Sequence, residues 1–496
     1  MRRGASVIVG ALVADETTRT RAAPALLVRS DALRRLFPDA LSEEDASRPA
    51  PELGAGGWHY RVVEVGFTSL ELTPTGDLAL RDSKRVYAAK AFVANRALGE
   101  LQGFLPAASF LLGRSWRMSD EASTARGEDA MSRLGRVRHD ARLPDGLTVL
   151  TVVEEAARWR RTLAECGAGW RLLPEPTREE LRPNLRNDRD DPWRSSKRRL
   201  AEDLQDLTRL SRVRPLHRAR ALRQGVARLS DPGLSAAMLG ATGESATLLD
   251  TILAAQREAP RGIWPDRISV SESIWRPVPS LEFFVDFETV SDLDDDLAKF
   301  PVRGGCAMIF MIGCGHVQAG QWQHRVFTTN ALVVDEEIRI VDAWLAHMRE
   351  VQARLGLPDI APLVHHWSSH EATSLERAFE AVRARHPDRG WEEPRWFDLL
   401  DRVFRAQPIG LRGAFSHGLK DVARALDALG LISSTWPSGG VADGVGAMVG
   451  AWSAERWRKE NGGGLRSTSV TQDIERYNEA DCRALLEILT LLRRSS

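Results

Sequence analysis

The sequence predicts an α/β fold in which a mixed sheet, flanked by helices, occupies the C-terminal part of the chain. Apolar runs bounded by turn residues, typical of buried strands, stand at 281–287, 307–314, 321–328 and 362–367. Apolar residues with helical spacing occur at 336–355, 371–385 and 471–494. Three strands followed by helix and strand in alternation indicate a sheet with helices on its faces.

The 496 residues are too many for one ordinary core, and shifts in composition divide the chain into four segments. Segment 1–174 contains strand-like stretches at 6–13, 25–28 and 59–65 and a helical stretch at 83–101. Segment 175–263 is rich in arginine, with helix-like runs at 193–207 and 215–229. Prolines punctuate 264–280, which we expect to be a linker before the sheet domain at 281–496.

The composition excludes several classes of protein. No apolar run approaches the roughly 18 residues of a membrane span. The basic start MRRG precedes a short apolar run that acidic residues follow, so we expect a first strand there rather than an export signal. None of the four cysteines forms a C-x-x-C pair, which argues against zinc ribbons and disulfide frameworks and fits the reducing cytoplasm. The formal net charge is zero, so global charge does not argue for a nucleic-acid partner.

Acidic residues occur on three separate predicted elements. Asp286 and Glu288, in LEFFVDFETV, are two apart on a strand and therefore share one face. Tyr477 and Asp481, in ERYNEADCRALLEIL, are four apart on a helix and share a face as well. Glu371 stands at a junction of strand and helix, in LVHHWSSHEATSLERA. Clustered oxygen ligands suit hard divalent cations, and two such ions about 4 Å apart can promote phosphodiester cleavage.

These motifs resemble the DEDD exonuclease superfamily, in the form of the YprB-like family with an RNase H fold. The resemblance covers about 281–492 and includes VDFET, LVHHWSSHE, WFDLL, SHGLKDVARAL and YNEAD. It implies a 3′–5′ exonuclease-type phosphodiesterase that uses two Mg²⁺ or Mn²⁺ ions and acts on DNA more than on RNA. It implies metal ligation by Asp286, Glu288 and Asp481, and the tyrosine subtype, in which Tyr477 orients the attacking water.

The fourth acid departs from the superfamily pattern, because Glu371 stands where an aspartate is usual. A carboxylate that is one methylene longer can still ligate metal, and Asp398 in WFDLL is the competing candidate. A zinc site at His366 and His370 beside Glu371 is a further alternative. The H-E-x-x-H pattern is absent, however, which favours hydrogen-bonded structural histidines or contacts with substrate.

The N-terminal segment resembles RecB-like PD-(D/E)XK nucleases in WHYRVVEVGFTSLELTPTG and the following helix. Glu64 matches their acid, but Gly66 stands where their lysine belongs. Lys90 and Ala94 occupy the positions of their glutamine and tyrosine, and Asp31 is a weak match to an earlier aspartate. Without the lysine that positions the water, we expect a RecB-like fold without catalysis. An unrelated α/β domain is the alternative.

The arginine-rich stretch DLTRLSRVRPLHRARALRQGVARLSDP resembles a helix–hairpin–helix unit, which binds phosphate backbones irrespective of sequence. Its hairpin lacks the usual glycine. Arg214, Arg218 and Arg223 are therefore candidate phosphate contacts, although a charge run is commonly a solvated face. Lys420 is a further candidate for contact with substrate phosphate, and its alternative is a solvated helix position.

The leading hypothesis is a metal-dependent nuclease in DNA repair or defence, with the C-terminal domain catalytic. Its alternative is a nucleic-acid-binding or scaffold subunit of a larger complex, with partners such as a helicase or a defence-system subunit. A zinc hydrolase is the third hypothesis.

Overall fold

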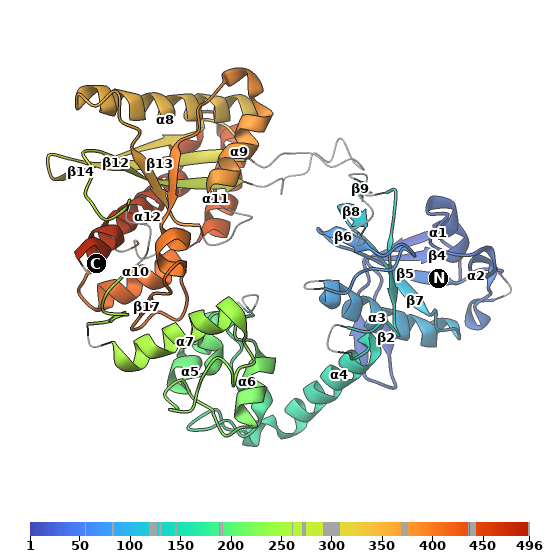
Figure 1. Cartoon of the computed structure of the whole chain (residues 1–496). Helices are drawn as coiled ribbons and strands as arrows, with labels where there is room; N and C mark the ends of the chain where they lie inside the picture. The colour runs from blue at the N-terminus through green and yellow to red at the C-terminus, as the bar shows by residue number, and fades with distance from the viewer. Residues whose placement is uncertain are drawn as a thin grey trace. The chain divides into compact units, whose positions relative to one another are not determined.

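The computed structural model forms two compact units of mixed α/β structure (Figure 1). One unit is Met1–Gly169, and the other contains Trp170–Leu293 and Cys306–Ser496. The structure describes residues 1–54, 56–81, 84–118, 126–127, 131–143, 146–187, 190, 192–259, 261–269, 274–290, 308–368, 375–434, 436 and 443–494.

The first unit is built on a five-stranded sheet of order β1-β4-β5-β7-β10. Its strands are Val7–Val9, Leu26–Arg29, Tyr60–Val65, Ala108–Leu112 and Gly135–Arg138, and only β5 and β7 pair in parallel. The helices of the unit are α1 (Ser30–Leu36), α2 (Glu43–Ser47), α3 (Lys84–Gln102) and α4 (Val149–Cys166). Two small sheets accompany it, β2 (Val13–Asp15) with β3 (Thr20–Ala22), and β6 (Ser69–Leu72) with β8 (Ser115–Met118) and β9 (Arg126–Gly127).

The strands expected at 25–28 and 59–65 and the helix expected at 83–101 are confirmed as β4, β5 and α3. The expected strand 6–13 is instead two strands. Gly10, with a φ of 67°, breaks the extended run after β1, and Val13 begins β2. A left-handed backbone of this kind is tolerated by glycine because it has no Cβ.

The arginine-rich segment forms helices α5 (Arg194–Asp203), α6 (Pro215–Leu222) and α7 (Gly243–Glu258). This segment packs on the C-terminal domain rather than standing apart from it. Gln256 donates hydrogen bonds from Nε2 to the carbonyl oxygens of Leu411 and Ala414, at 2.9 and 3.0 Å. Strand β11 (Ile263–Trp264) also pairs with β17 (Gly410–Leu411). Both regions therefore belong to the second unit.

Within 264–280, expected to be a linker, two described residues belong to the core, although Val278 is 77 % exposed. Ile268 and the fully buried Trp275 pack in the same cluster as Phe404 and Leu489 of the C-terminal domain. Arg493 donates to the backbone oxygen of Trp275 at 2.7 Å. Prolines mark breaks in regular structure, but they do not indicate whether the apolar residues between them are buried.

The second unit contains a five-stranded sheet of order β14-β13-β12-β15-β16. Its strands are β12 (Glu282–Val290), β13 (Met308–Gln318), β14 (Gln321–Thr328), β15 (Leu363–His366) and β16 (Arg395–Asp398). The first three form an antiparallel meander, and β15 and β16 are parallel to β12. The mixed sheet expected from the apolar runs is confirmed, and only β16 was not expected.

Helices cover both faces of this sheet (Figure 1). They are α8 (Val334–Arg354), α9 (Leu375–Arg385), α10 (Leu419–Ala428), α11 (Gly444–Asn461) and α12 (Ser469–Arg494). Side chains alternate along β12, so that Phe283, Val285 and Phe287 pack in a cluster with residues of α8 and α9. Phe284 faces the cluster of α10 and α12. By the same alternation, Asp286 and Glu288 lie on the face that α12 covers.

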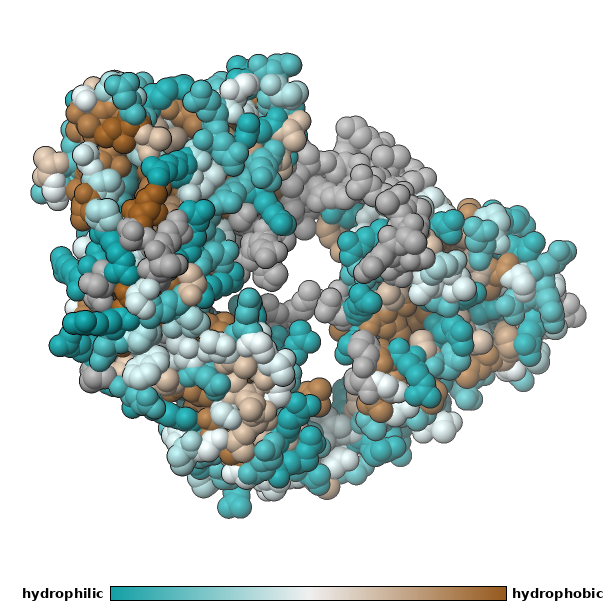
Figure 2. Space-filling model, viewed as in Figure 1, coloured by the Kyte–Doolittle hydropathy of each residue, from teal (hydrophilic) through white to brown (hydrophobic). Residues whose placement is uncertain are grey.

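The visible surface of the molecule is mostly hydrophilic, with small separate hydrophobic patches (Figure 2). In the part of the chain that the structure describes, none of the helices is both long enough and apolar enough to cross a membrane.

Candidate metal centre

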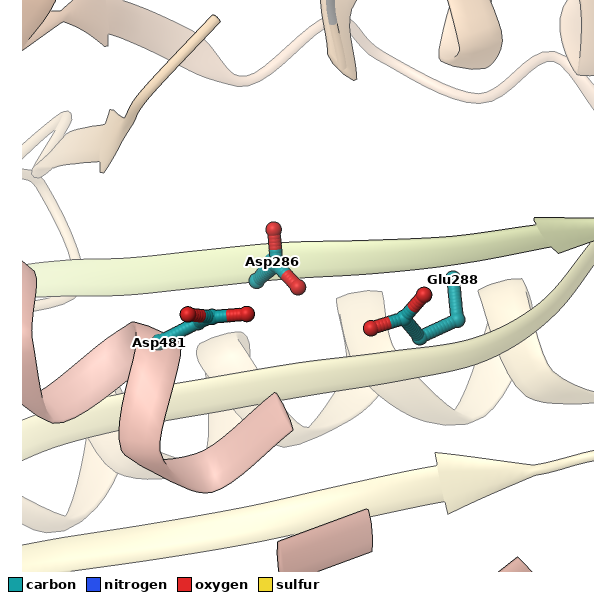
Figure 3. Close-up of side chains that lie close together, drawn as sticks. All are labelled: Asp286, Glu288 and Asp481. Atoms are coloured by element: carbon teal, nitrogen blue, oxygen red, sulfur yellow. The ribbon is translucent and has the colours of Figure 1, made fainter. Parts of the chain in front are cut away.

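Three carboxylates from two distant parts of the sequence meet where β12 and α12 cross. Asp286 and Glu288 extend from β12, and Asp481 extends from α12 (Figure 3). Each offers one ligand oxygen, and these oxygens lie within 4.8 Å of one another. The structure thus brings together three of the four acids expected to ligate metal, and the fourth, Glu371, lies outside the described residues. Carboxylate oxygens at this spacing suit Mg²⁺ or Mn²⁺, which prefer hard oxygen donors.

A close contact between β13 and α12 holds this arrangement in place. Gly313 pairs with Asp286 across the strands β13 and β12. A Cβ at Gly313 would lie 1.8 Å from Oδ1 of Asn478, so only glycine leaves room for that side chain. Asn478 uses the space to donate from Nδ2 to the Asp286 carboxylate at 2.9 Å and to the Asp286 backbone oxygen at 3.2 Å.

Trp436 contacts the third carboxylate. Its indole N–H donates to Oδ1 of Asp481 at 2.9 Å. A charged acceptor strengthens such a hydrogen bond and fixes one oxygen of the carboxylate. Asn478 and Trp436 are the two site residues that sequence reasoning missed. Asn478 stands between the two predicted residues in YNEAD, three positions before Asp481, and this spacing could have indicated it. No pattern in the sequence distinguishes Trp436.

The carboxylates are crowded and buried, and this favours their protonated forms when no cation is present. Burial, and then the charge of Asp481, raises the pKa of Asp286 well above its ordinary value. Burial and the charges of Asp286 and Asp481 do the same for the pKa of Glu288. Burial raises the pKa of Asp481 to about 6, although Lys420 opposes the shift. A divalent cation would neutralise this repulsion, so the donor set fits such an ion.

Tyr477 and Lys420 border the acid cluster. Tyr477 is 7 % exposed, and burial together with the charge of Asp481 raises the pKa of its hydroxyl. The phenol therefore stays neutral and can donate a hydrogen bond.

The Nζ of Lys420 lies 4.0 Å from the centre of the Tyr477 ring and 5.8 Å from that of Trp436. Burial lowers the pKa of Lys420, while Asp481 and Glu288 counteract the shift. Lys420 is therefore a half-buried cation at the site rather than a fully solvated residue.

Neither candidate for the fourth acid is placed in the cluster by the described residues. Glu371 lies outside the described residues. Asp398 ends β16 and does not belong to the cluster of three acids. Its Oδ1 accepts from the backbone N–H groups of Leu400 and Asp401, at 2.9 and 3.3 Å, and so caps the turn that follows. Burial raises its pKa.

The described histidines of LVHHWSSHE are occupied in hydrogen bonds. Nε2 of His365 is 2.8 Å from Glu282, which also forms an ion pair with Arg493. Nε2 of His366 is 3.1 Å from Glu376. His370, the other proposed zinc ligand, lies outside the described residues. Among the residues that can be described, only the Asp286, Glu288 and Asp481 group has ligand spacing for a metal ion.

The candidate phosphate contacts of the arginine-rich segment are not equivalent. Arg214 and Arg223 are exposed at the two ends of α6. Arg218 is 4 % exposed, and its guanidinium donates to Asp206 at 2.9 Å. The expectation that Arg218 contacts phosphate is therefore wrong, because its charge is already neutralised inside the protein. Arg212, which precedes α6, adopts a left-handed φ of 65°.

Glu64, the acid of the N-terminal motif, has a lysine partner from another element. Glu64 lies buried on β5, and Nζ of Lys90, from α3, is 2.8 Å from its Oε2. A Cβ at Gly66 would lie 2.9 Å from the ring of Tyr87, so position 66 has little room for a longer side chain. Asp31, the weak match to a further acid, is instead paired with Arg29 at 2.6 Å.

Comparison of the chain with protein-family models, with curated proteins and with solved structures gave no match.

Proposed function

We propose that this protein is a divalent-metal-dependent nuclease whose active site is the cluster of Asp286, Glu288 and Asp481. The observation that carries the proposal is the convergence of these three carboxylates, with ligand oxygens within 4.8 Å of one another, beside Tyr477 and Lys420. The strand order β14-β13-β12-β15-β16, with helices on both faces, supports an RNase H-like domain of the DEDD type. The expected substrate is DNA, or RNA, attacked in the manner of a 3′–5′ exonuclease.

The chain's own residues divide the work of such a site. Asp286, Glu288 and Asp481 would hold the cation, and the hydrogen bonds from Asn478 and Trp436 orient Asp286 and Asp481. Tyr477 directs its neutral hydroxyl toward an attacking water. Lys420 adds a positive charge where the substrate phosphate would approach. When bound, Mg²⁺ or Mn²⁺ would supply Lewis acidity and lower the pKa of the attacking water.

The test is a cleavage assay with the purified full-length protein. End-labelled single- and double-stranded DNA and RNA are incubated with Mg²⁺, with Mn²⁺ or with EDTA. We expect metal-dependent shortening of at least one substrate, and none with the double variant Asp286→Ala/Asp481→Ala, folded normally by circular dichroism. Cleavage by this variant at the wild-type rate would refute the assignment. Binding without cleavage under all conditions would favour a scaffold subunit.

A further inference from the structure

A cavity of 540 Å³ lies within the second unit, where the arginine-rich segment meets the C-terminal domain. Its lining combines residues of α5 and of the preceding loop with Phe415, α10 and the residue before α11. The cationic residues of the lining are Arg186, Arg194, Lys197, Arg198, Arg209 and Arg424. They outnumber its acids, Glu202, Asp421 and Asp443. We call this site the arginine cavity.

Four of these arginines, Arg186, Arg198, Arg209 and Arg424, form no ion pair with any residue that the structure describes. The cation Lys197, by contrast, is paired with Asp190. The guanidinium carbon of Arg209 lies 4.2 Å from the centre of the Phe415 ring. Burial lowers the pKa of both Arg186 and Arg209. An anion that enters the cavity would offset the cost of burying these charges.

Helix α10 contributes residues both to the arginine cavity and to the border of the acid cluster. Helix α10 contributes Asp421 and Arg424 to the cavity, and Lys420 of the same helix lies against Tyr477. Burial lowers the pKa of Lys420, and the charge of Asp443 in the lining partly opposes this shift. A ligand that extends along α10 can therefore reach both places.

We infer that the arginine cavity holds the phosphodiester backbone of the polynucleotide strand whose scissile phosphate lies at the acid cluster. The inference rests on the proposed nuclease function. Guanidinium groups bind phosphate oxygens through two parallel N–H donors, and an arginine stacked on an aromatic ring presents those donors in a fixed plane. Contacts of this kind position a strand without reading its sequence. The strand-binding surface is thus the arginine cavity rather than the predicted set around α6.

The first test measures binding alone, with EDTA present to prevent cleavage. A fluorescein-labelled single-stranded oligodeoxynucleotide is titrated at several salt concentrations with wild type and with Arg198→Ala/Arg424→Ala. The control is Arg199→Ala/Arg349→Ala, which removes the same charge from exposed positions of the second unit that do not line the cavity. Two lost phosphate contacts should reduce the slope of log K against log salt by roughly 1.4. Equal slopes for the two double variants would overturn the inference.

The second test compares a long substrate with a minimal one in the presence of Mn²⁺. The p-nitrophenyl ester of thymidine 5′-monophosphate contains one phosphodiester and cannot occupy the cluster and the cavity together. Arg198→Ala/Arg424→Ala should raise KM for the oligonucleotide at least about 10-fold and leave cleavage of the ester unchanged. An unchanged KM for the oligonucleotide, with cleavage intact, would refute the inference and leave the proposed function standing. Cavity-dependent binding by a wild type that cleaves nothing would refute the proposed function instead.

Discussion

The three clustered carboxylates repel one another when they are ionised, and a bound cation would offset this repulsion. Asp481, 6 % exposed, has a pKa of about 6, and the pKa values of Asp286 and Glu288 are also raised. A raised carboxylate pKa means that the folded state binds the proton more tightly than the unfolded chain does. The stability that this proton confers is complete below about pH 4 and is lost as the pH rises through about 6. Near neutral pH the metal-free protein is therefore less stable than it would be with these carboxylates protonated.

Replacing Asp481 by Asn should stabilise the metal-free protein and abolish its response to metal. At about pH 8 the gain in unfolding free energy should be about 3 kcal/mol, and it should vanish near pH 4. The amide still accepts a hydrogen bond from Trp436, so the contact itself is retained. Melting temperatures in EDTA and in Mn²⁺ measure both effects.

Wild type should gain more from Mn²⁺ at about pH 8 than at about pH 5, because the ligands must lose protons to bind metal. A wild-type melting temperature that Mn²⁺ leaves unchanged at the higher pH would contradict a metal centre here.

Tyr477 should matter less for catalysis than the carboxylates do. It ligates nothing in the proposed mechanism, so Tyr477→Phe should lower kcat by about 10- to 100-fold, as for the loss of a positioning group. Asp286→Ala should lower kcat by at least about 10³-fold, or 4 kcal/mol of barrier. Both are measured with the same substrate and a saturating amount of Mn²⁺. If Tyr477→Phe were as damaging as Asp286→Ala, the tyrosine would have a more direct role than orientation.

Sequence reasoning found the three clustered acids because their placement on a shared face depends on local spacing. The D-x-E pair shares a face of a strand, and Tyr477 and Asp481 share a face of a helix. It missed Trp436, which comes to Asp481 through tertiary packing alone. It misjudged Arg218 for the same reason, because Asp206, twelve positions earlier, neutralises it in the interior. A charge run does not reveal which of its members are already paired.

At the scale of elements, some long patterns were predictable, whereas helices α4, α7 and α11, of 16 to 18 residues, and the short strand β16 were not. Strands β12, β13 and β14 and helices α8 and α12 have long apolar runs or sustained helical spacing, and each formed where expected. Strand β16 has four residues, too few for an alternating pattern to stand out. The burial of Ile268 and Trp275 within the expected linker was missed because it depends on core partners far along the chain, such as Phe404.

The buried pair of Arg218 and Asp206 joins α6 to the turn before it. Asp206 also accepts from the backbone N–H of Thr208 at 2.8 Å, so its carboxylate anchors both parts. Arg218→Ala leaves this buried charge uncompensated and should cost about 3–5 kcal/mol of unfolding free energy. The exposed Arg223→Ala, on the same segment, should change it by less than about 0.5 kcal/mol. Urea unfolding of the two variants makes the comparison. Similar small effects would mean that the pair contributes little.

At the scale of the whole molecule, the chain contains two compact units and one described cluster of metal-ligand spacing, which lies in the second unit. The first unit retains a buried acid and a lysine in contact, Glu64 and Lys90. The sequence suggested that the lysine was lost, because the acid-x-Lys motif places it on the same strand as Glu64, at the position of Gly66. In the structure the partner comes from the facing helix. The absence of a lysine therefore no longer argues strongly that the first unit lacks catalytic activity. The remaining argument is that the described residues of this unit contain no further cluster of acids.

We expect the first unit to be catalytically silent even so. A lone carboxylate offers too few oxygen donors to hold a divalent cation, and Asp31 is engaged with Arg29. Glu64→Gln keeps the shape of the buried side chain and removes its charge. In the full-length protein this change should leave kcat/KM on DNA within about a factor of three, whereas Asp286→Ala in the same preparation series should abolish cleavage. Melting temperatures of both variants establish that the fold persists. A loss with Glu64→Gln as large as that with Asp286→Ala, with both folds intact, would contradict this expectation and give the first unit a part in catalysis.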